Sequence, residues 1–232
     1  MTTRGKLIAV EGIDGSGKQT QVRLLAQALE SRGHRVFSTG FPQYESWFGK
    51  MVGQFLNGDY GSLGTVDPHF TALLYAGDRF ECKGPVVAAL DRGDVVIADR
   101  YIASNLAHQT ARSSPDRREE FRAWIEHLEY NIYGLPKEDL VLYLRVPPRQ
   151  AQTLVAKKSA RAYTDSAHDI LESNLSHLQE ASDIYDLLAR RPNWKTIECV
   201  ASRTQAIRAP EDIAQEIFAA VQSLLPTLQE KR

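Results

Sequence analysis

A glycine-rich segment near the N-terminus has the residue types and spacing of a phosphate-binding loop. Gly12, Ile13, Asp14, Gly15, Ser16, Gly17 and Lys18 fit the pattern G-x-x-x-x-G-K. The glycines let the backbone turn so that successive N–H groups face inward, and the start of the following helix adds positive potential there. Lys18 can then reach the β- and γ-phosphates of a nucleotide. Because a strand is expected before this loop and a helix after it, we predict a nucleoside triphosphate site over residues 12–20.

The residues after the lysine depart from the usual pattern. Ser or Thr normally follows the lysine and holds Mg²⁺, but Gln19 stands there and Thr20 comes one position later. The departure weakens the interpretation as a GTPase or a motor ATPase and favours a kinase for a small molecule. A carboxylate elsewhere in the chain must then share in holding the metal.

A second pair of reactive residues follows the apolar run at 94–98. Asp99 and Arg100 come where this predicted strand ends, and the carboxyl ends of strands in such sheets lie beside the phosphate loop. Asp99 can bind or orient Mg²⁺, and Arg100 can bridge the donor and acceptor phosphates. The alternative is a structural ion pair at the end of a strand, which the phosphate loop upstream disfavours.

Short apolar runs alternate with helical patterns along the chain. Strands are expected at 6–11, 36–39, 94–98, 140–146 and 195–200. Helices are expected at 19–32, 46–56, 68–80, 85–90, 121–133, 149–158, 169–190 and 210–225. Near-continuous apolar strands between helices predict an α/β fold, with a parallel sheet covered on both faces, in one domain over residues 1–232. The charged stretch 112–120 is predicted to be a solvated loop and helix start without a functional role.

The composition excludes several classes of protein. The 232 residues are 43% apolar and 25% charged, which excludes disordered, collagenous and coiled-coil chains. A net charge of −1 argues against a general nucleic-acid or membrane binder, which needs a positive field. Cys82 and Cys199 cannot form a disulfide framework, so we expect two reduced thiols and a cytoplasmic location. No apolar run approaches the ~20 residues of a membrane span.

These residues belong to a set of motifs that resembles the thymidylate kinase family. The matching motifs are E-G-I-D-G-S-G-K (11–18), F-P-x-Y (41–44), L-L-Y-A-G-D-R (73–79), D-R-Y (99–101), G-L-P-K-x-D-L-V (134–141) and D-x-x-E (169–172). The resemblance implies a three-layer P-loop kinase fold with a central parallel sheet and a small mobile lid at about 157–168. It also implies ATP-dependent, Mg²⁺-assisted phosphorylation of dTMP to dTDP in dTTP biosynthesis, by a homodimer.

The resemblance implies roles for residues around the acceptor nucleotide. Asp14 would hold the 3′-hydroxyl of dTMP and help with Mg²⁺. Tyr75 would stack on thymine, and Arg79, four residues on and on the same helix face, would bond a thymine carbonyl. Core packing is the alternative for a lone aromatic such as Tyr75. The other residues expected at dTMP are Phe41, Tyr44, Arg100, Asn105, His108, Gln109 and Leu171.

The resemblance also implies a source of positive charge outside the phosphate loop. That loop holds no arginine, so Lys157, Lys158 and Arg161 of the lid would supply the charge, unless they are solvated residues of a surface loop. Asp169 and Glu172 lie three residues apart on one helix face and would act near the metal and the sugar. They fit a capping-box-like role at a helix start equally well.

Two other functions remain open at this stage. One is a kinase for a different nucleoside monophosphate, which the Tyr75 and Arg79 pair disfavours. The other is a non-catalytic nucleotide-binding switch. Switch GTPases need D-x-x-G and N-K-x-D, but the first place holds Asp99-Arg100-Tyr101-Ile102 and the second motif occurs nowhere in the chain.

Overall fold

Five parallel strands form the sheet in the computed structural model, which describes residues 4–155, 175–202, 204 and 206–225. The strands are β1 (Lys6–Glu11), β2 (Val36–Gly40), β3 (Val95–Asp99), β4 (Leu140–Arg145) and β5 (Trp194–Glu198). Their order across the sheet is β2-β3-β1-β4-β5. β1 is therefore central and pairs with β3 on one side and β4 on the other.

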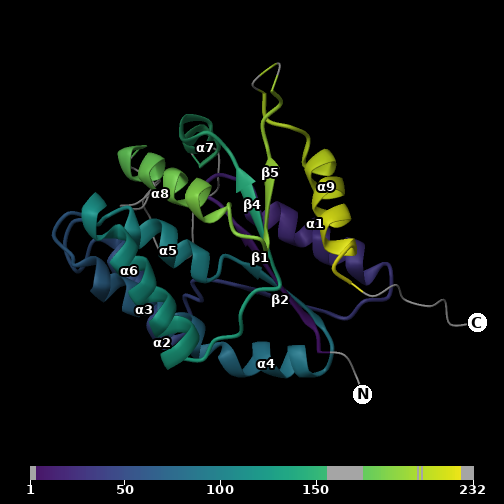
Figure 1. Ribbon diagram of the computed structural model, residues 1–232, viewed down its shortest axis with the longest axis horizontal. Coiled ribbons are helices and arrows are strands. Elements are labelled where there is room, and N and C mark those ends of the chain that lie inside the picture. Colours follow the sequence, from purple (N-terminus) through teal and green to yellow (C-terminus); the bar gives the residue numbers. More distant parts are fainter. Residues whose placement is uncertain (1–3, 156–174, 203, 205, 226–232) are drawn as a thin grey trace, which may run out of the picture.

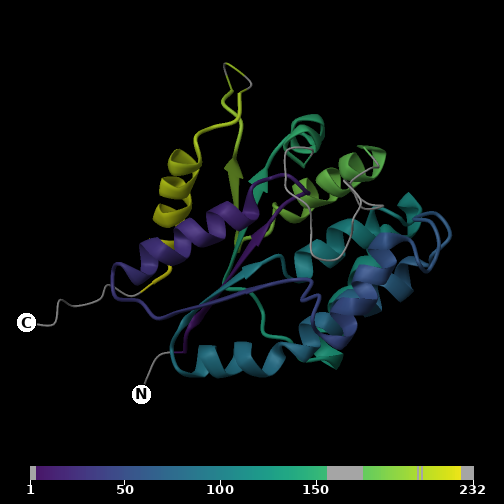
Figure 2. The same ribbon diagram turned by 180° about the vertical axis from the view of Figure 1, so that it is seen from behind.

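Helices cover both faces of this sheet (Figures 1 and 2). α1 (Lys18–Glu30) and α9 (Pro210–Gln222) pack together on one face. α5 (Ile102–Thr110) and α8 (Leu175–Leu188) pack together on the other. The remaining helices are α2 (Trp47–Asn57), α3 (Pro68–Glu81), α4 (Lys83–Asp91), α6 (Arg118–Glu126) and α7 (Pro148–Val155), with a 3₁₀ turn η1 (Pro115–Arg117) and a π-helical turn η2 (His127–Ile132).

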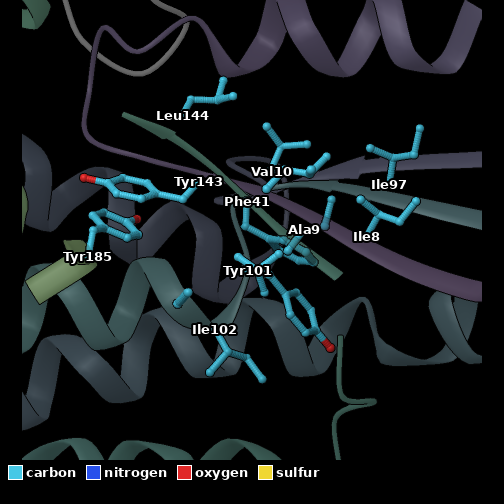
Figure 3. Close-up of a cluster of buried hydrophobic side chains, with 14 of the residues drawn as sticks. Ile8, Ala9, Val10, Phe41, Ile97, Tyr101, Ile102, Tyr143, Leu144 and Tyr185 are labelled. Carbon is cyan, nitrogen blue, oxygen red and sulfur yellow. The ribbon is translucent and has the colours of Figure 1, made fainter. Parts of the chain in front are cut away.

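The main core lies between the sheet and its helices. Leu7, Ile8, Ala9 and Val10 are all buried, because β1 is covered on both faces. Figure 3 shows part of this core, where the rings of Tyr143 and Tyr185 stack with centroids 5.2 Å apart. A smaller apolar cluster joins α2 and α3; its buried members are Val52, Phe55, Leu56, Val66 and Leu74. Within the described residues, no helix combines the length and apolar character needed to cross a bilayer.

The predicted fold class is confirmed, and each strand begins and ends within two residues of its expected bounds. The sequence did not predict α5, because every residue of this helix is buried and its pattern therefore lacks a polar face. The single helix expected at 121–133 is α6 followed by the π-helical turn η2. The expected lid at 157–168, and the start of the helix expected at 169–190, lie outside the described residues.

One further expectation was wrong in part. The stretch 112–120 was predicted to be solvated, but Arg112 is only partly exposed and donates to Thr71 Oγ1 at 2.6 Å and to Gln109 Oε1 at 2.8 Å. Its guanidinium also donates to the carbonyl oxygens of Leu63 and Val66. Arg112 therefore holds the loop before α3 against α5.

Replacing Ile97 by Ala tests the assignment of the core. Ile97 is 0% exposed on β3, so Ile97→Ala should lower the free energy of unfolding by about 2–5 kcal/mol. Urea titrations followed by circular dichroism measure this change. Ile132, which is 64% exposed, is the control: Ile132→Ala should stay within about 0.5 kcal/mol. Equal effects of the two substitutions would contradict the assignment.

Candidate functional site

The glycine-rich loop leaves the carboxyl end of β1 and leads directly into α1. Gly15 has a φ of 84°, and a Cβ there would lie 2.1 Å from the carbonyl oxygen of Ala151 on α7. Gly17, with a φ of 87°, is the N-cap of α1. Both positions favour glycine, since residues with a side chain rarely adopt a positive φ, and Gly15 also has no room for a Cβ atom. The backbone therefore forms a tight turn against α7 at a helix N-terminus, the arrangement that binds anions.

The ammonium group of Lys18 lies against this loop. Lys18 is 7% exposed, and its Nζ donates to the carbonyl oxygens of Gly12 at 2.9 Å and Ile13 at 2.8 Å and to Ser16 Oγ at 3.3 Å. The charge is thus held beside the inner side of the loop. Gln19 and Thr20 occupy exposed positions in the first turn of α1.

Arg100 brings the end of β3 against the same loop. Its N–H donates to the carbonyl of Val10 at 3.0 Å, and its guanidinium pairs with Asp14 Oδ1 at 2.5 Å and donates to Gly12 O at 3.3 Å. Arg100 has a φ of 67°, a strained backbone conformation for a residue other than glycine. Burial opposes the charge, but the surrounding acidic groups, Asp14 first among them, together outweigh burial and raise the pKa of Arg100, which is therefore charged.

Two of the four predicted metal ligands lie near the loop. Asp99 is half-buried and its carboxylate makes no hydrogen bond with another described residue, whereas Asp14 pairs with Arg100. Asp169 and Glu172 lie outside the described residues. No group of three or more His, Cys, Asp and Glu side chains suited to a metal occurs within the described ranges. The oxygen donors present suit Mg²⁺ bound jointly with nucleotide phosphates rather than in an all-protein cage.

Glu11, the last residue of β1, belongs to the motif at 11–18, but the sequence predicted no role for it. Its carboxylate is 0% exposed and accepts from the N–H groups of Tyr101 at 2.7 Å and Ser104 at 3.2 Å. It also accepts from the hydroxyls of Ser104 at 2.7 Å and Tyr185 at 2.9 Å. Glu11 therefore caps the N-terminus of α5 and ties that helix to the strand before the phosphate loop. The sequence signal for this role is a glutamate at the end of an otherwise apolar strand.

α5 carries three of the residues expected at dTMP. All three are buried: Asn105, His108 and Gln109. His108 Nδ1 lies 3.3 Å from Nε2 of His177 on α8, a residue that the sequence did not single out. Gln109 Oε1 accepts from Thr71 Oγ1 at 2.7 Å and from Arg112.

The remaining acceptor-side residues lie on other elements. Tyr44 precedes α2 and Tyr75 lies on α3, and both are half-buried against the smaller apolar cluster. Phe41 is a member of the main core, with its ring centroid 6.0 Å from that of Tyr101. Leu171 and the lid residues Lys157, Lys158 and Arg161 lie outside the described residues.

Arg79 forms a buried ion pair that the sequence did not predict. Arg79 Nε and Nη2 donate to Oε2 and Oε1 of Glu129 at 2.5 and 2.7 Å, and both side chains are buried. Asn105 Nδ2 donates to the same Glu129 Oε1 at 2.8 Å. The three residues come from α3, α5 and η2, and no spacing in the sequence relates them.

Comparisons with known proteins agree with this geometry. The family model described as "Thymidylate kinase" matches residues 10–209. A thymidylate kinase of Mycobacterium tuberculosis is 34% identical over 218 residues, which cover 89% of this chain and 99% of that protein. A probable thymidylate kinase of Pyrobaculum calidifontis is 31% identical, with coverage of 96% and 98%. In fold, the chain is similar to the solved thymidylate kinase of Candida albicans, with a TM-score of 0.73, 19% identity and coverage of 95% and 92%.

The predicted P-loop kinase fold and the predicted activity, ATP-dependent phosphorylation of dTMP to dTDP, are thereby confirmed. Neither the other nucleoside monophosphate kinases nor the nucleotide-binding switches gain support from these matches. The chain belongs to the thymidylate kinase family.

Proposed function

We propose that residues at the carboxyl edge of the sheet transfer the γ-phosphoryl group of ATP directly to the phosphate of dTMP, giving ADP and dTDP. The observation that carries this proposal is the meeting of two charged motifs. Lys18 and Arg100, 82 positions apart (100 − 18), both donate to the carbonyl oxygen of Gly12. Positive charge is thus concentrated where the phosphate loop ends and the acceptor helix α5 begins.

The acceptor phosphate oxygen is already a nucleophile at neutral pH, so the reaction needs no general base. Catalysis then comes from aligning the two nucleotides and neutralising charge on the transferred group. Lys18 and the loop N–H groups face the donor phosphates, and Arg100 faces both donor and acceptor. Asp14 holds Arg100 through their ion pair and remains the proposed partner of the sugar 3′-hydroxyl.

Mg²⁺ is part of this proposal because the oxygen donors fit it. Asp99 and Asp14 would hold the ion together with the phosphates of ATP, and Asp169 and Glu172 remain proposed ligands. When bound, Mg²⁺ draws negative charge away from the phosphate oxygens. The lid residues Lys158 and Arg161, with Lys157, are proposed to add positive charge on the donor side.

The acceptor nucleotide is proposed to lie along α3 and α5. Tyr75 stacks on thymine, while Arg79 and Asn105 form hydrogen bonds with the edge of the base. Tyr44 and Arg100 bind the monophosphate. His108 lies beside the sugar, and Phe41, Gln109 and Leu171 complete the pocket.

We also infer a homodimer in a reducing cytoplasm. One stripe of α3 leaves three large apolar side chains partly exposed: Phe70, Leu73 and Phe80. Trp47 on α2 is 71% exposed as well. A second copy of the chain that covers these side chains would remove a sizeable apolar surface from water. Both cysteines are buried and unpaired, as a reducing compartment requires.

The two histidines on the acceptor side, His108 and His177, are neutral. Burial, and then the charge of Arg100, hold the pKa of His108 well below its ordinary value of 6.5, and burial lowers the pKa of His177 to about 4. Among the described residues, the charged groups that act on the pair are Arg100, Lys18 and Arg112, which oppose protonation, and Asp14 and Glu180, which favour it. A hydrogen bond between two imidazole rings requires at least one of them to be neutral and to accept, and the lowered pKa values keep both rings neutral at pH 7.

Stability should therefore fall as the pH falls through the ordinary histidine pKa. Between pH 6.5 and about 4, unfolded His177 binds a proton that folded His177 does not, so the loss grows as pH decreases and stops near pH 4. Between pH 7.5 and 5 the wild type should lose about 2 kcal/mol more than His177→Gln, by urea titration at each pH. Glu138, whose pKa burial raises to about 7, acts in the opposite direction, but equally in both proteins. Parallel pH profiles would contradict the assignment.

Replacing Lys18 by Ala tests the proposed catalytic site. Lys18→Ala should reduce dTMP-dependent ADP production by ~100-fold or more, since a charge that faces the transferred group is lost. Binding of dTMP, measured by its thermal shift, should change by less than ~5-fold. Lys50→Ala, on the exposed surface of α2, is the control and should retain full activity. A wild-type protein that prefers AMP, GMP or CMP over dTMP, or an active Lys18→Ala, would overturn the proposal.

A further inference from the structure

Glu129 lies at the meeting point of three elements and is 0% exposed. It comes from η2, a π-helical turn of six residues, a local distortion of the helix that often occurs at functional sites. Its two carboxylate oxygens accept from Nε and Nη2 along one edge of the Arg79 guanidinium, and Oε1 also accepts from Asn105. Glu129 takes no part in the proposed phosphoryl transfer.

The bonds to Asn105 decide which end of its amide is presented. Nδ2 donates to the carbonyl oxygen of Ala72 at 3.1 Å and to Glu129 Oε1 at 2.8 Å, and both partners are acceptors only. Turning the amide over would put its oxygen against two other oxygens. The opposite atom, Oδ1, is buried and has no partner among the described residues. A buried acceptor of this kind demands a donor, since leaving it unpaired costs about 1–3 kcal/mol.

The hydrogen bonds that Arg79 makes leave one of its three guanidinium nitrogens, Nη1, available to a ligand. Nε and Nη2 are both occupied by Glu129, and Nη1 makes no hydrogen bond with another described residue. Ala72, to which Asn105 donates, lies one turn before Tyr75 on α3, and Arg79 lies one turn after it. Asn105 is therefore anchored to α3 one turn before Tyr75, and Arg79 extends from the same helix one turn after it.

We propose that Glu129 is a positioning residue that fixes the hydrogen-bond polarity of the base site. It turns Asn105 so that Oδ1 accepts, and it orients Arg79 so that Nη1 donates. A thymine edge offers the complementary pair, with N3–H as donor and O4 as acceptor. A cytosine edge offers the reverse, with N3 as acceptor and the 4-amino group as donor, so it meets like groups at both positions. This inference rests on the proposed placement of dTMP and names what sets its specificity.

A role in stability alone does not account for this arrangement. A buried ion pair contributes little net stability compared with apolar residues of the same volume, because both charges lose their water. An ion pair also needs no third partner, yet Glu129 reaches Asn105 on a different helix. A site that hydrogen-bonds its ligand in this way rejects a ligand with the opposite polarity far more strongly than shape alone would.

The test compares dTMP with dCMP in Glu129→Gln, at saturating ATP and Mg²⁺. The glutamine amide can donate to Asn105 Oδ1, so the carbonyl oxygen of Ala72 is then the one described acceptor that still opposes turning of the Asn105 amide. We expect KM for dTMP to rise by ~10–100-fold, while kcat changes by less than ~5-fold, because Glu129 touches no phosphate-binding residue. The preference for dTMP over dCMP in kcat/KM should fall by ~100-fold.

Glu138→Gln is the matched control. Glu138 is also a buried glutamate, and it accepts from Tyr130 of the same π-helical turn, but it contacts neither Arg79 nor Asn105. The preference for dTMP should stay within ~3-fold of the wild type. Glu129→Asp is the second variant, for use if Glu129→Gln does not fold. Its shorter carboxylate keeps the charge opposite Arg79 but cannot reach both partners, so the preference should fall by ~10-fold.

Calorimetric titration with dTMP and with dCMP separates this inference from the proposed function. If the wild type binds dTMP selectively but forms no dTDP, the proposed function fails, and binding to Glu129→Gln still tests the role of Glu129. If the wild type phosphorylates dTMP and a folded Glu129 variant keeps the full preference over dCMP, the inference is overturned. It is equally overturned if the folded variant loses kcat alone.

Discussion

The buried carboxylate of Glu11 is the interaction on which the site depends. It lies at the end of the central strand, immediately before the phosphate loop, and it receives two backbone N–H groups and two hydroxyls. A carboxylate taken out of water is stable only with such a full set of donors. Because two of those donors begin α5, Glu11 fixes that helix relative to the loop. Glu11 thereby joins the strand before the phosphate loop to the helix that carries three of the residues proposed to bind dTMP.

The order of the strands in the sheet brings the phosphate loop and Arg100 together. β1 and β3 are parallel neighbours, with Val10 opposite Asp99, so the segments that follow them emerge at the same edge. The phosphate loop follows one strand and Arg100 follows the other. The positive charges of Lys18 and Arg100 therefore lie at one edge of the sheet, beside the carboxylates of Asp14, Asp99 and Glu11.

The sequence predicted those parts of the molecule in which neighbouring residues act together. The phosphate loop and the pair Asp99 and Arg100 are local motifs. The apolar strands predict a parallel sheet with helices on both faces. α5 was missed because it is buried on every side and so has no amphipathic period. The pairing of Glu129 with Arg79 was missed because 50 residues separate them, and only the packed helices bring them together. Arg112 belongs to a charged stretch that the sequence predicted to be solvated, but its hydrogen bonds connect α3 and α5.

A crystal structure with dTMP, Mg²⁺ and a non-hydrolysable ATP analogue tests the central claim most directly. The loop after β1 and the helix tied to it by Glu11 should place donor and acceptor phosphates in line. We expect the β- and γ-phosphates of the analogue in the loop of residues 12–18, the dTMP phosphate at Arg100, and thymine on Tyr75. The hydrogen bonds from α5 to Glu11 should be unchanged. A dTMP molecule bound away from α5, or triphosphates outside the loop, would contradict it.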